Sequence, residues 1–327
     1  MQNSVHRASR VLLNCGDPCI SYFTKRDLTN ENVGPIERLW ELKGAKQILR
    51  KQSTGGLWRY PNPHAKEVSP LQDYDQLETY RRLGQLVEKY GMNGAHPAIE
   101  RCAEFLFGKQ TGEGDFRGIY GRQYTPNYSA GIMELLIKAG YEGDARIERA
   151  FRWLLAIRQE DGGWAIPLRT AKKNFLREAN NSALKLTVAV PPDLSRPSSH
   201  LVTGVVLRAF AAHNRYRSSD EAQVAAELVT ARFFKRDAYV DRGAPEYWGR
   251  VAFPFWFTDI VSAMDSISLL GRTPLRNQET EVALTWLLKR QMRSGLFDLK
   301  LLKTGDPLLG YWVALAICRV LRRYHYS

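Results

Sequence analysis

The segment Gln159-Glu-Asp-Gly-Gly-Trp164 is one of four related stretches in this chain. In each stretch an apolar run ends in Gln, a Gly follows four residues later, and an aromatic residue comes one or two positions after that Gly. We call these stretches Gln–aromatic motifs. The other three are Gln52-Ser-Thr-Gly-Gly-Leu-Trp58, Gln110-Thr-Gly-Glu-Gly-Asp-Phe116 and Gln291-Met-Arg-Ser-Gly-Leu-Phe297.

Each part of the motif has a physical role at the end of a helix. The last carbonyl groups of a helix lack partners, and a Gly just beyond them adopts the left-handed conformation that ends the helix. The aromatic side chain can fold back over the apolar stripe, and Gln offers both a donor and an acceptor to the backbone. The first three motifs are spaced by 58 and 49 residues, which leaves room for one helix pair per repeat. The pattern therefore predicts an all-α repeat protein.

The third motif carries a resemblance to a known family. Together with the preceding Phe151-Arg-Trp-Leu-Leu-Ala-Ile-Arg158, it resembles the Gln-Trp repeat of squalene–hopene and oxidosqualene cyclases. Protein prenyltransferase β subunits share this repeat in a weaker form. The resemblance implies an α/α toroid, in which about six helix pairs close into a barrel.

Helical spacing of apolar residues divides the chain into two alternating sets of helices. The expected outer helices occupy residues 5–14, 36–51, 98–109, 147–158, 222–235 and 281–290. The expected inner helices start near Pro18, Asp75, Asn127, Ser199, Asp259 and Leu309. We expect one domain over residues 1–327, with a central cavity whose mouth is formed by the connections 52–72, 111–124, 159–198 and 236–255.

An irregular insertion at about 168–198 interrupts the repeat. It contains four basic residues, Arg169, Lys172, Lys173 and Arg177. A connection of this length without a clear element suggests a lid, and an insertion without a role in chemistry is the alternative. The basic residues suit a diphosphate or the headgroups of an anionic membrane.

Composition limits the class of protein and its partners. The chain of 327 residues is 44% hydrophobic, which is ample for a core, and its formal net charge is +13. The Lys and Arg are spread along the chain without a recognisable nucleic-acid module, so we expect no nucleic-acid partner. The sequence has neither an apolar run of about 18 residues nor an apolar signal core. A cytoplasmic location is expected, with peripheral attachment to a membrane left open.

The cysteines and histidines do not predict a metal site or a cofactor. Cys15 and Cys19 are close in sequence, but no second Cys/His pair completes a zinc site. In protein prenyltransferase β subunits an inner-helix His completes a zinc site, and His200 is the residue here that matches it. The Asp-x-Cys partner of that site is missing, so the sequence does not support zinc-dependent prenyl transfer.

Two acids open one expected inner helix and are the candidate catalytic residues. Asp73 and Asp75 resemble the first two acids of the Asp-x-Asp-Asp motif of class II terpene cyclases, while Gln76 stands in place of the third. In that family the middle acid protonates an alkene or epoxide, which implies Asp75 as general acid and Asp73 as its modulator. Such a donor must be neutral, and burial or a nearby carboxylate achieves this.

A helix cap is the alternative role for these two acids. A helix N-terminus favours the carboxylate form, and Asp73 or Asp75 as an N-cap with Glu78 in a capping box fits the same sequence.

Five further residues are candidates for contact with a substrate. Aromatic faces stabilise carbocations, and packing in the core is the alternative role for such rings. The candidates lie at the expected inner-helix starts and in the aromatic run 253–257: Tyr128, His200, Trp256, Asp259 and Trp312.

Three classes of function remain open from the sequence. The first is an isoprenoid-handling enzyme that starts cyclisation with an acid. The second is a non-catalytic toroid that binds a lipid or a protein. The third is a carbohydrate-processing enzyme in which Asp75 and Asp259 act together. The inner-helix starts carry few acids, which favours an apolar ligand over a sugar.

Overall fold

The computed structural model describes residues 1–327 except 69–70, 172–187, 240–242, 272–276, 303–304 and 327. Within the described residues, regular structure is helical apart from two short strands, β1 (Arg250–Val251) and β2 (Lys300–Leu301), which pair in parallel. This confirms the predicted all-α class. The predicted closure of six helix pairs into a ring stays a prediction.

The chain divides into two compact units. The middle unit is Ile36–Ala209, and the terminal unit combines Met1–Pro35 with Phe210–Ser327. The boundary falls within helix α11 (His200–Ala212). The expectation of a single domain over residues 1–327 stays a prediction.

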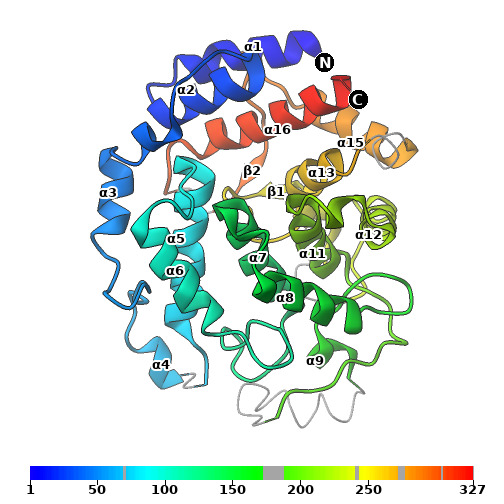
Figure 1. Ribbon diagram of the computed structural model, residues 1–327. Coiled ribbons are helices and arrows are strands. Elements are labelled where there is room, and N and C mark those ends of the chain that lie inside the picture. The colour runs from blue at the N-terminus through cyan, green and yellow to red at the C-terminus, as the bar shows by residue number, and fades with distance from the viewer. Residues whose placement is uncertain (69–70, 172–187, 240–242, 272–276, 303–304, 327) are drawn as a thin grey trace. The chain divides into compact units, whose positions relative to one another are not determined.

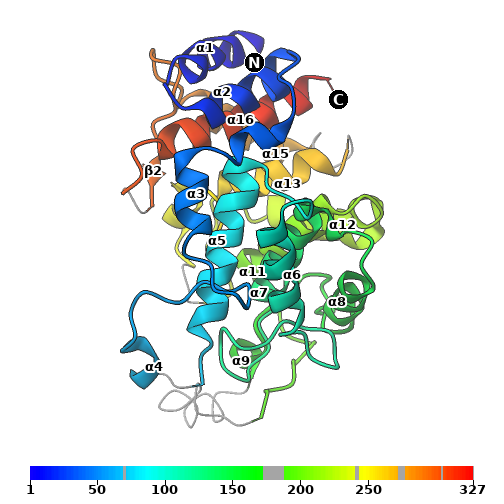
Figure 2. The same cartoon turned by 60° about the vertical axis from the view of Figure 1, so that its left-hand side comes forward.

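In the middle unit, helices that run into a Gln–aromatic motif alternate with helices that follow one (Figures 1 and 2). The first set is α3 (Lys43–Leu49), α6 (Pro97–Phe107) and α8 (Ala145–Ala156). The second set is α5 (Tyr74–Tyr90), α7 (Pro126–Leu136), which continues into the π turn η3 (Ile137–Tyr141), and α11. The short helices η2 (Ile36–Leu39), α4 (Ala65–Val68) and α9 (Pro167–Thr170) lie in connections. Helix α5 contacts α3, α6 and α7.

Burial distinguishes the two sets of helices. Every residue of α7 from Ser129 to Leu136 is buried, whereas α8 buries one stripe that includes Ile147, Ala150, Phe151 and Leu154. A helix that is apolar on nearly all sides belongs to the interior, and a helix with one apolar stripe faces solvent on the other side. The two expected kinds of helix are therefore present.

The terminal unit contains helices from both ends of the chain. Its helices are α1 (Gln2–Leu13), α2 (Pro18–Thr24) with the π turn η1 (Lys25–Thr29), α12 (Asp220–Thr230), α13 (Ile260–Leu269), α15 (Gln278–Leu288) and α16 (Leu309–Tyr326). Two 3-10 turns, η5 (Tyr216–Ser218) and η6 (Pro245–Gly249), lie between them. Helix α16 contacts α1, α2 and α13, so the first and last helices lie side by side (Figure 1).

The side-chain amide of the motif Gln joins two backbone carbonyls. Gln110 Nε2 donates to Gly114 O at 2.9 Å within its own turn and to Arg146 O at 2.7 Å at the start of α8. The motif at the end of one helix is thereby tied to the first turn of the next helix of the same set. The same pairs occur for Gln52 with Gly56 and Ala98 in α6, and for Gln291 with Gly295 and Ser4 in α1.

The motif Gly permits the backbone to approach that same helix. Gly114 has a φ of +114°, and a Cβ atom there would lie 2.7 Å from Arg149 O. Only a residue without a Cβ fits this contact at no cost. The corresponding neighbours are Arg101 O for Gly56 and Arg7 O for Gly295, each three residues beyond the carbonyl that the Gln amide binds.

The aromatic residue of the motif joins the two sets of helices. Trp164 is fully buried; its backbone N–H donates to Thr203 Oγ1 in α11, and its indole Nε1 donates to Leu154 O in α8. The backbone N–H groups of Trp58 and Phe116 likewise donate to Thr79 Oγ1 in α5 and Ser129 Oγ in α7. The first two motifs therefore fix a helix pair as well as a neighbouring repeat.

The third motif binds a different partner. Gln159 Nε2 donates to Asp193 O at 2.8 Å and to Arg196 O at 2.9 Å. These carbonyls belong to the end of the insertion, which returns to the fold here. The Gln159 amide still donates two hydrogen bonds, but its acceptors are carbonyls of the insertion, where the other motifs use a carbonyl in the first turn of a helix.

Replacement of Gly114 by Ala tests the close approach to α8. We expect Gly114→Ala to lower the free energy of unfolding by ~1–3 kcal/mol, because Ala is strained at this positive φ and its Cβ meets the Arg149 carbonyl. Gly112→Ala is the matched control, since no atom lies within 4 Å of a Cβ in that position of the same turn. Urea denaturation measures both variants, and equal losses would contradict this role of Gly114.

Candidate functional site

Helix α5 begins at the two candidate acids, and Asp73 is its N-cap. Asp73 Oδ1 accepts the backbone N–H of Gln76 at 2.9 Å, and its Oδ2 forms an ion pair with Lys109 Nζ at 2.8 Å. Its own N–H donates to Gly118 O at 2.9 Å. Of the two roles considered for Asp73, these contacts agree with that of a helix N-cap. The alternative of a capping box with Glu78 does not form, because with Asp73 as the N-cap the third helical residue is Gln76; Glu78 pairs with Arg82 at 2.7 Å.

Asp75 forms a hydrogen bond with the connection between the first motif and α4. Its Oδ1 accepts the backbone N–H of Tyr60 at 2.9 Å, and the side chain is half-buried. The rings of Tyr60 and Tyr74 lie 5.0 Å apart over the same helix start. Asp75 thus connects the end of the first motif to the first turn of α5.

Gln76 occupies the position of the third acid. Its side chain is fully buried, and neither Nε2 nor Oε1 has a hydrogen-bond partner among the described residues. Gly118 lies directly against it, since a Cβ on Gly118 would come within 2.3 Å of Gln76 Oε1. The amide is enclosed by the loop that bonds Asp73.

Tyrosines line the contact between α5 and α7. Tyr128, one of the candidate ligand contacts, is half-buried and packs edge-on against Tyr80, with ring centroids 6.2 Å apart. Its other neighbour is Tyr120 at 6.1 Å, which is 38% exposed. The three rings form a continuous run from the interior to the surface of the middle unit. His200, another candidate, is buried at the first residue of α11 in the same unit.

A buried charge network lies deeper between the same helices. Arg208 Nε in α11 donates to Glu134 Oε2 in α7 at 2.8 Å, and both side chains are at most 5% exposed. Lys138 Nζ binds Glu134 Oε1 at 2.8 Å and Glu88 at 2.6 Å. Burial raises the pKa of Tyr80 far above its ordinary value, so its phenol is neutral beside this network.

Burial and charge act in opposite directions on Glu134. Burial alone would raise the pKa of Glu134, but Arg208 and Lys138 outweigh it and hold the pKa below its ordinary value. The ionised pair therefore stabilises the fold above the unfolded pKa of a glutamate, about 4.3. This contribution is lost as the pH falls through the lower folded pKa.

In the terminal unit, two candidate residues have structural contacts. Asp259 is buried and is the N-cap of α13: its Oδ1 accepts from the N–H groups of Val261 and Ser262, and Ser262 Oγ completes a capping box. Trp312 is 2% exposed and stacks on Phe253, with centroids 5.3 Å apart and planes 5° apart. Trp256 is half-buried in the aromatic run. Their assignment to a ligand stays a prediction.

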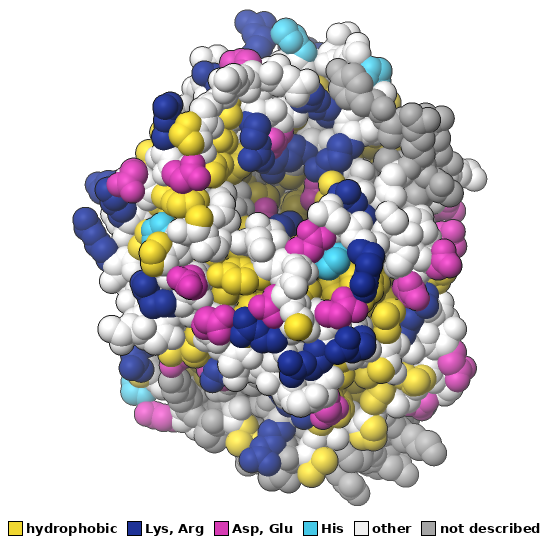
Figure 3. All heavy atoms as spheres, viewed as in Figure 1, with side chains coloured by type: hydrophobic (Ala, Val, Ile, Leu, Met, Phe, Trp, Pro, Cys, Tyr) yellow, Lys and Arg dark blue, Asp and Glu magenta, His cyan; other side chains and the backbone are white. Residues whose placement is uncertain are grey.

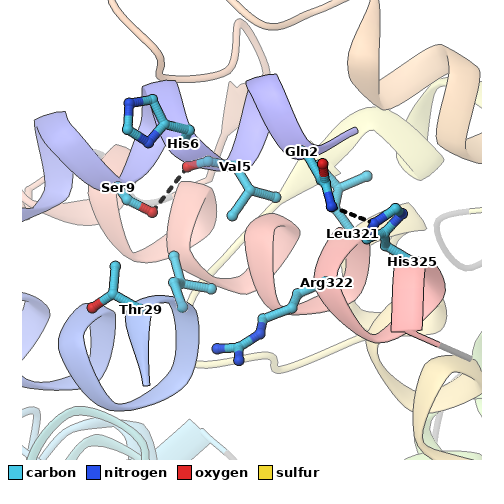
Figure 4. Close-up of a pocket in the computed structure, with 9 residues that line it drawn as sticks. Gln2, Val5, His6, Ser9, Thr29, Leu321, Arg322 and His325 are labelled. Atoms are coloured by element: carbon cyan, nitrogen blue, oxygen red, sulfur yellow. Dashed lines mark hydrogen bonds between the residues drawn. The ribbon is translucent and has the colours of Figure 1, made fainter. Parts of the chain in front are cut away.

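A separate pocket of about 200 Å³ lies in the terminal unit (Figure 4). Its lining includes Val5 and Ser9 of α1, Leu28 and Thr29 of η1, and Leu321 and Arg322 of α16. Gln2 and His325 form a hydrogen bond of 2.6 Å at this place. The seven residues that the sequence nominates for the site, all of them described, lie elsewhere in the chain.

The basic insertion is described in part. Arg169 lies in α9, while Lys172, Lys173 and Arg177 lie outside the described residues. Beyond the gap, the side-chain amide of Gln123 donates to Val188 O and accepts from Val190 N, each at 3.0 Å. On the face shown in Figure 3, acidic side chains lie among the Lys and Arg, consistent with dispersed charge.

The described residues contain neither a cluster of metal ligands nor a helix that could span a membrane. No group of three or more His, Cys, Asp or Glu is placed there to hold a metal ion, and the four cysteines are free thiols. No helix in that part of the chain has the length and apolar character needed to cross a bilayer.

Part of the chain, including the start of α5, matches a known family. Residues 63–190 match the squalene-hopene cyclase C-terminal domain. The matched segment contains Asp73, Asp75 and the motifs at Gln110 and Gln159. Over these residues, which are fewer than half of the chain, the protein is similar to the squalene–hopene cyclase family.

Other comparisons add little to this cyclase-like assignment. A solved structure described as "Crystal structure of a protein from Actinoplanes" is 14% identical, with a TM-score of 0.47, and the match covers 99% of each chain. No curated protein matches the chain.

The pair of Glu134 and Arg208 was not predicted from the sequence, although the sequence contains a signal for it. Glu134 and Arg208 are single charges inside otherwise apolar runs, Gly131-Ile-Met-Glu-Leu-Leu136 and Val205-Val-Leu-Arg-Ala-Phe210. A charge that is surrounded by apolar residues on a buried helix requires a partner of opposite sign. Two helices of the inner set carry single buried charges of opposite sign, and this pattern predicts that Glu134 pairs with Arg208.

Disruption of this pair tests its role in the middle unit. We expect Arg208→Met to lower the free energy of unfolding by ~3–5 kcal/mol, because Glu134 loses its buried partner. The double variant Glu134→Leu/Arg208→Met should lose much less, since no buried carboxylate remains and Lys138 keeps Glu88. Equilibrium denaturation of the wild type, both single variants and the double variant measures this coupling. Additive losses would contradict it.

Proposed function

We propose that this cyclase-like protein binds an isoprenoid or a similar apolar lipid without protonating it. The family match supports the ligand class, since squalene is an isoprenoid hydrocarbon. The contacts at the start of α5 support the second part of the proposal, namely that the bound lipid is not protonated. Ligand binding and the absence of acid chemistry are tested separately below.

Acid-initiated cyclisation needs a neutral carboxylic acid that faces the substrate. Asp73 is instead an N-cap in an ion pair with Lys109, so its carboxyl group is engaged in contacts within the fold. Asp75 accepts a backbone N–H, a contact that a carboxylate makes best. Gln76 replaces the third acid with an amide that carries no acidic proton. These contacts support a binding role over acid catalysis.

The tyrosines between α5 and α7 are the ligand contacts that we favour in the middle unit. Tyr128 and the exposed Tyr120 present aromatic area that the buried ring of Tyr80 supports, and rings of this kind bind apolar chains well. In the same unit, His200 stays a proposed ligand contact. In the terminal unit, Trp256 stays a proposed ligand contact. A sugar site pairing Asp75 with Asp259 is less favoured, because Asp259 caps α13.

Incubation of the purified protein with squalene and with farnesol tests both parts of the proposal. We expect each lipid to co-elute with the protein in size-exclusion chromatography, and gas chromatography with mass spectrometry should recover it unchanged. Asp75→Asn is the matched variant, because its Oδ1 keeps the hydrogen bond from Tyr60 while the acidic proton is lost. It should bind both lipids as the wild type does.

Two results would contradict the proposal in different ways. A cyclised product that appears with the wild type and disappears with Asp75→Asn would assign acid-initiated cyclisation to Asp75. Failure of both proteins to retain either lipid would remove the binding function and leave a scaffold of another kind.

A further inference from the structure

The buried side-chain amide of Gln76 packs against Gly118 but makes no hydrogen bond within the described part of the chain. It is fully buried, and its Nε2 and Oε1 both lack partners among the described residues. A buried polar group without a partner destabilises the folded state, whereas an apolar side chain of the same length would not. An amide in this position therefore points to a polar group that joins it when a ligand is bound.

A second group of polar atoms without partners lies at the start of α7. Thr125 is the N-cap residue of α7 but makes no cap hydrogen bond, is 1% exposed, and its Oγ1 has no partner among the described residues. Asn127 Oδ1 is buried and without a partner in the same part of the chain. Thr125 and Asn127 offer a hydroxyl donor and an amide acceptor, respectively.

The contacts between α5 and α7 place these two groups at the same end of the helix pair. Tyr80 packs against Tyr128, and Glu88 binds Lys138, so both helices run in the same direction. Gln76 lies one turn before Tyr80, and Thr125 and Asn127 lie just before Tyr128. The backbone N–H groups at these two helix starts also favour an electron-rich oxygen.

We infer that Gln76, Thr125 and Asn127 form a recognition site for a hydroxyl group of the ligand. The inference rests on the proposed lipid binding and specifies its class: an isoprenoid alcohol in preference to a hydrocarbon of the same length. The ligand oxygen accepts from Gln76 Nε2 or Thr125 Oγ1, and its hydrogen is donated to Asn127 Oδ1 or Gln76 Oε1. The apolar chain extends along the tyrosines.

Farnesol and farnesene test this inference, because they share a C15 skeleton and differ in the hydroxyl group. We expect the wild type to bind farnesol at least tenfold more tightly than farnesene in a fluorescence displacement assay. Gln76→Met keeps the length of the side chain without its polar atoms. This variant should bind farnesol and farnesene with about equal affinity, and its affinity for farnesene should match that of the wild type. It should also raise the melting temperature of the ligand-free protein.

Gln85→Met is the matched control on the same helix, since the Gln85 side chain is half-buried and accepts from Arg82. It should keep the preference for farnesol. Equal wild-type affinities for the two lipids would overturn the hydroxyl site but leave the binding function intact. A preserved preference in Gln76→Met, whatever its melting temperature, would also overturn it. Failure to bind either lipid would instead contradict the proposed function, and the hydroxyl site with it.

Discussion

The donation of two hydrogen bonds by a glutamine amide is the interaction on which this fold depends. In three of the four motifs the Nε2 group joins the carbonyl of its own turn to a carbonyl in the first turn of the next helix of the same set. The motif Gly makes this approach possible because a Cβ would collide with the same helix. One amide thus ends a helix and sets the position of its neighbour, so successive repeats are joined without a continuous sheet.

The position of the candidate site follows from these connections. The aromatic residue of the first motif is bonded to Thr79 in α5, and Asp75 bonds Tyr60 just beyond that motif. The loop after the second motif returns to Asp73 through Gly118. Two repeats therefore converge on the first turn of α5. The acids that would serve chemistry in a cyclase hold this junction together here, and a neutral amide is buried beside them.

The sequence predicted the helices well because each motif combines a local helix end with a strong apolar period. The expected starts at Asp75, Asn127 and Ser199 agree closely with Tyr74, Pro126 and His200. The partners of the glutamine amides could not be predicted from the sequence, because they lie far away along the chain. Gln52 and Ala98, for example, are separated by 46 residues. Burial of Gln76 and the pairing of Glu134 with Arg208 likewise depend on how whole helices pack. The choice between cap and acid at Asp73 required the position of Lys109, which only the tertiary structure supplies.

The most direct test of this account is the unfolding free energy of Gln110→Glu. Glutamate has nearly the same shape but cannot donate, and it places an anionic oxygen beside the carbonyls of Gly114 and Arg146. We expect a loss of at least ~2 kcal/mol. Gln278→Glu, an exposed change in the first turn of α15, should be neutral or slightly stabilising. A Gln110→Glu variant as stable as Gln278→Glu would contradict the role of the glutamine amide.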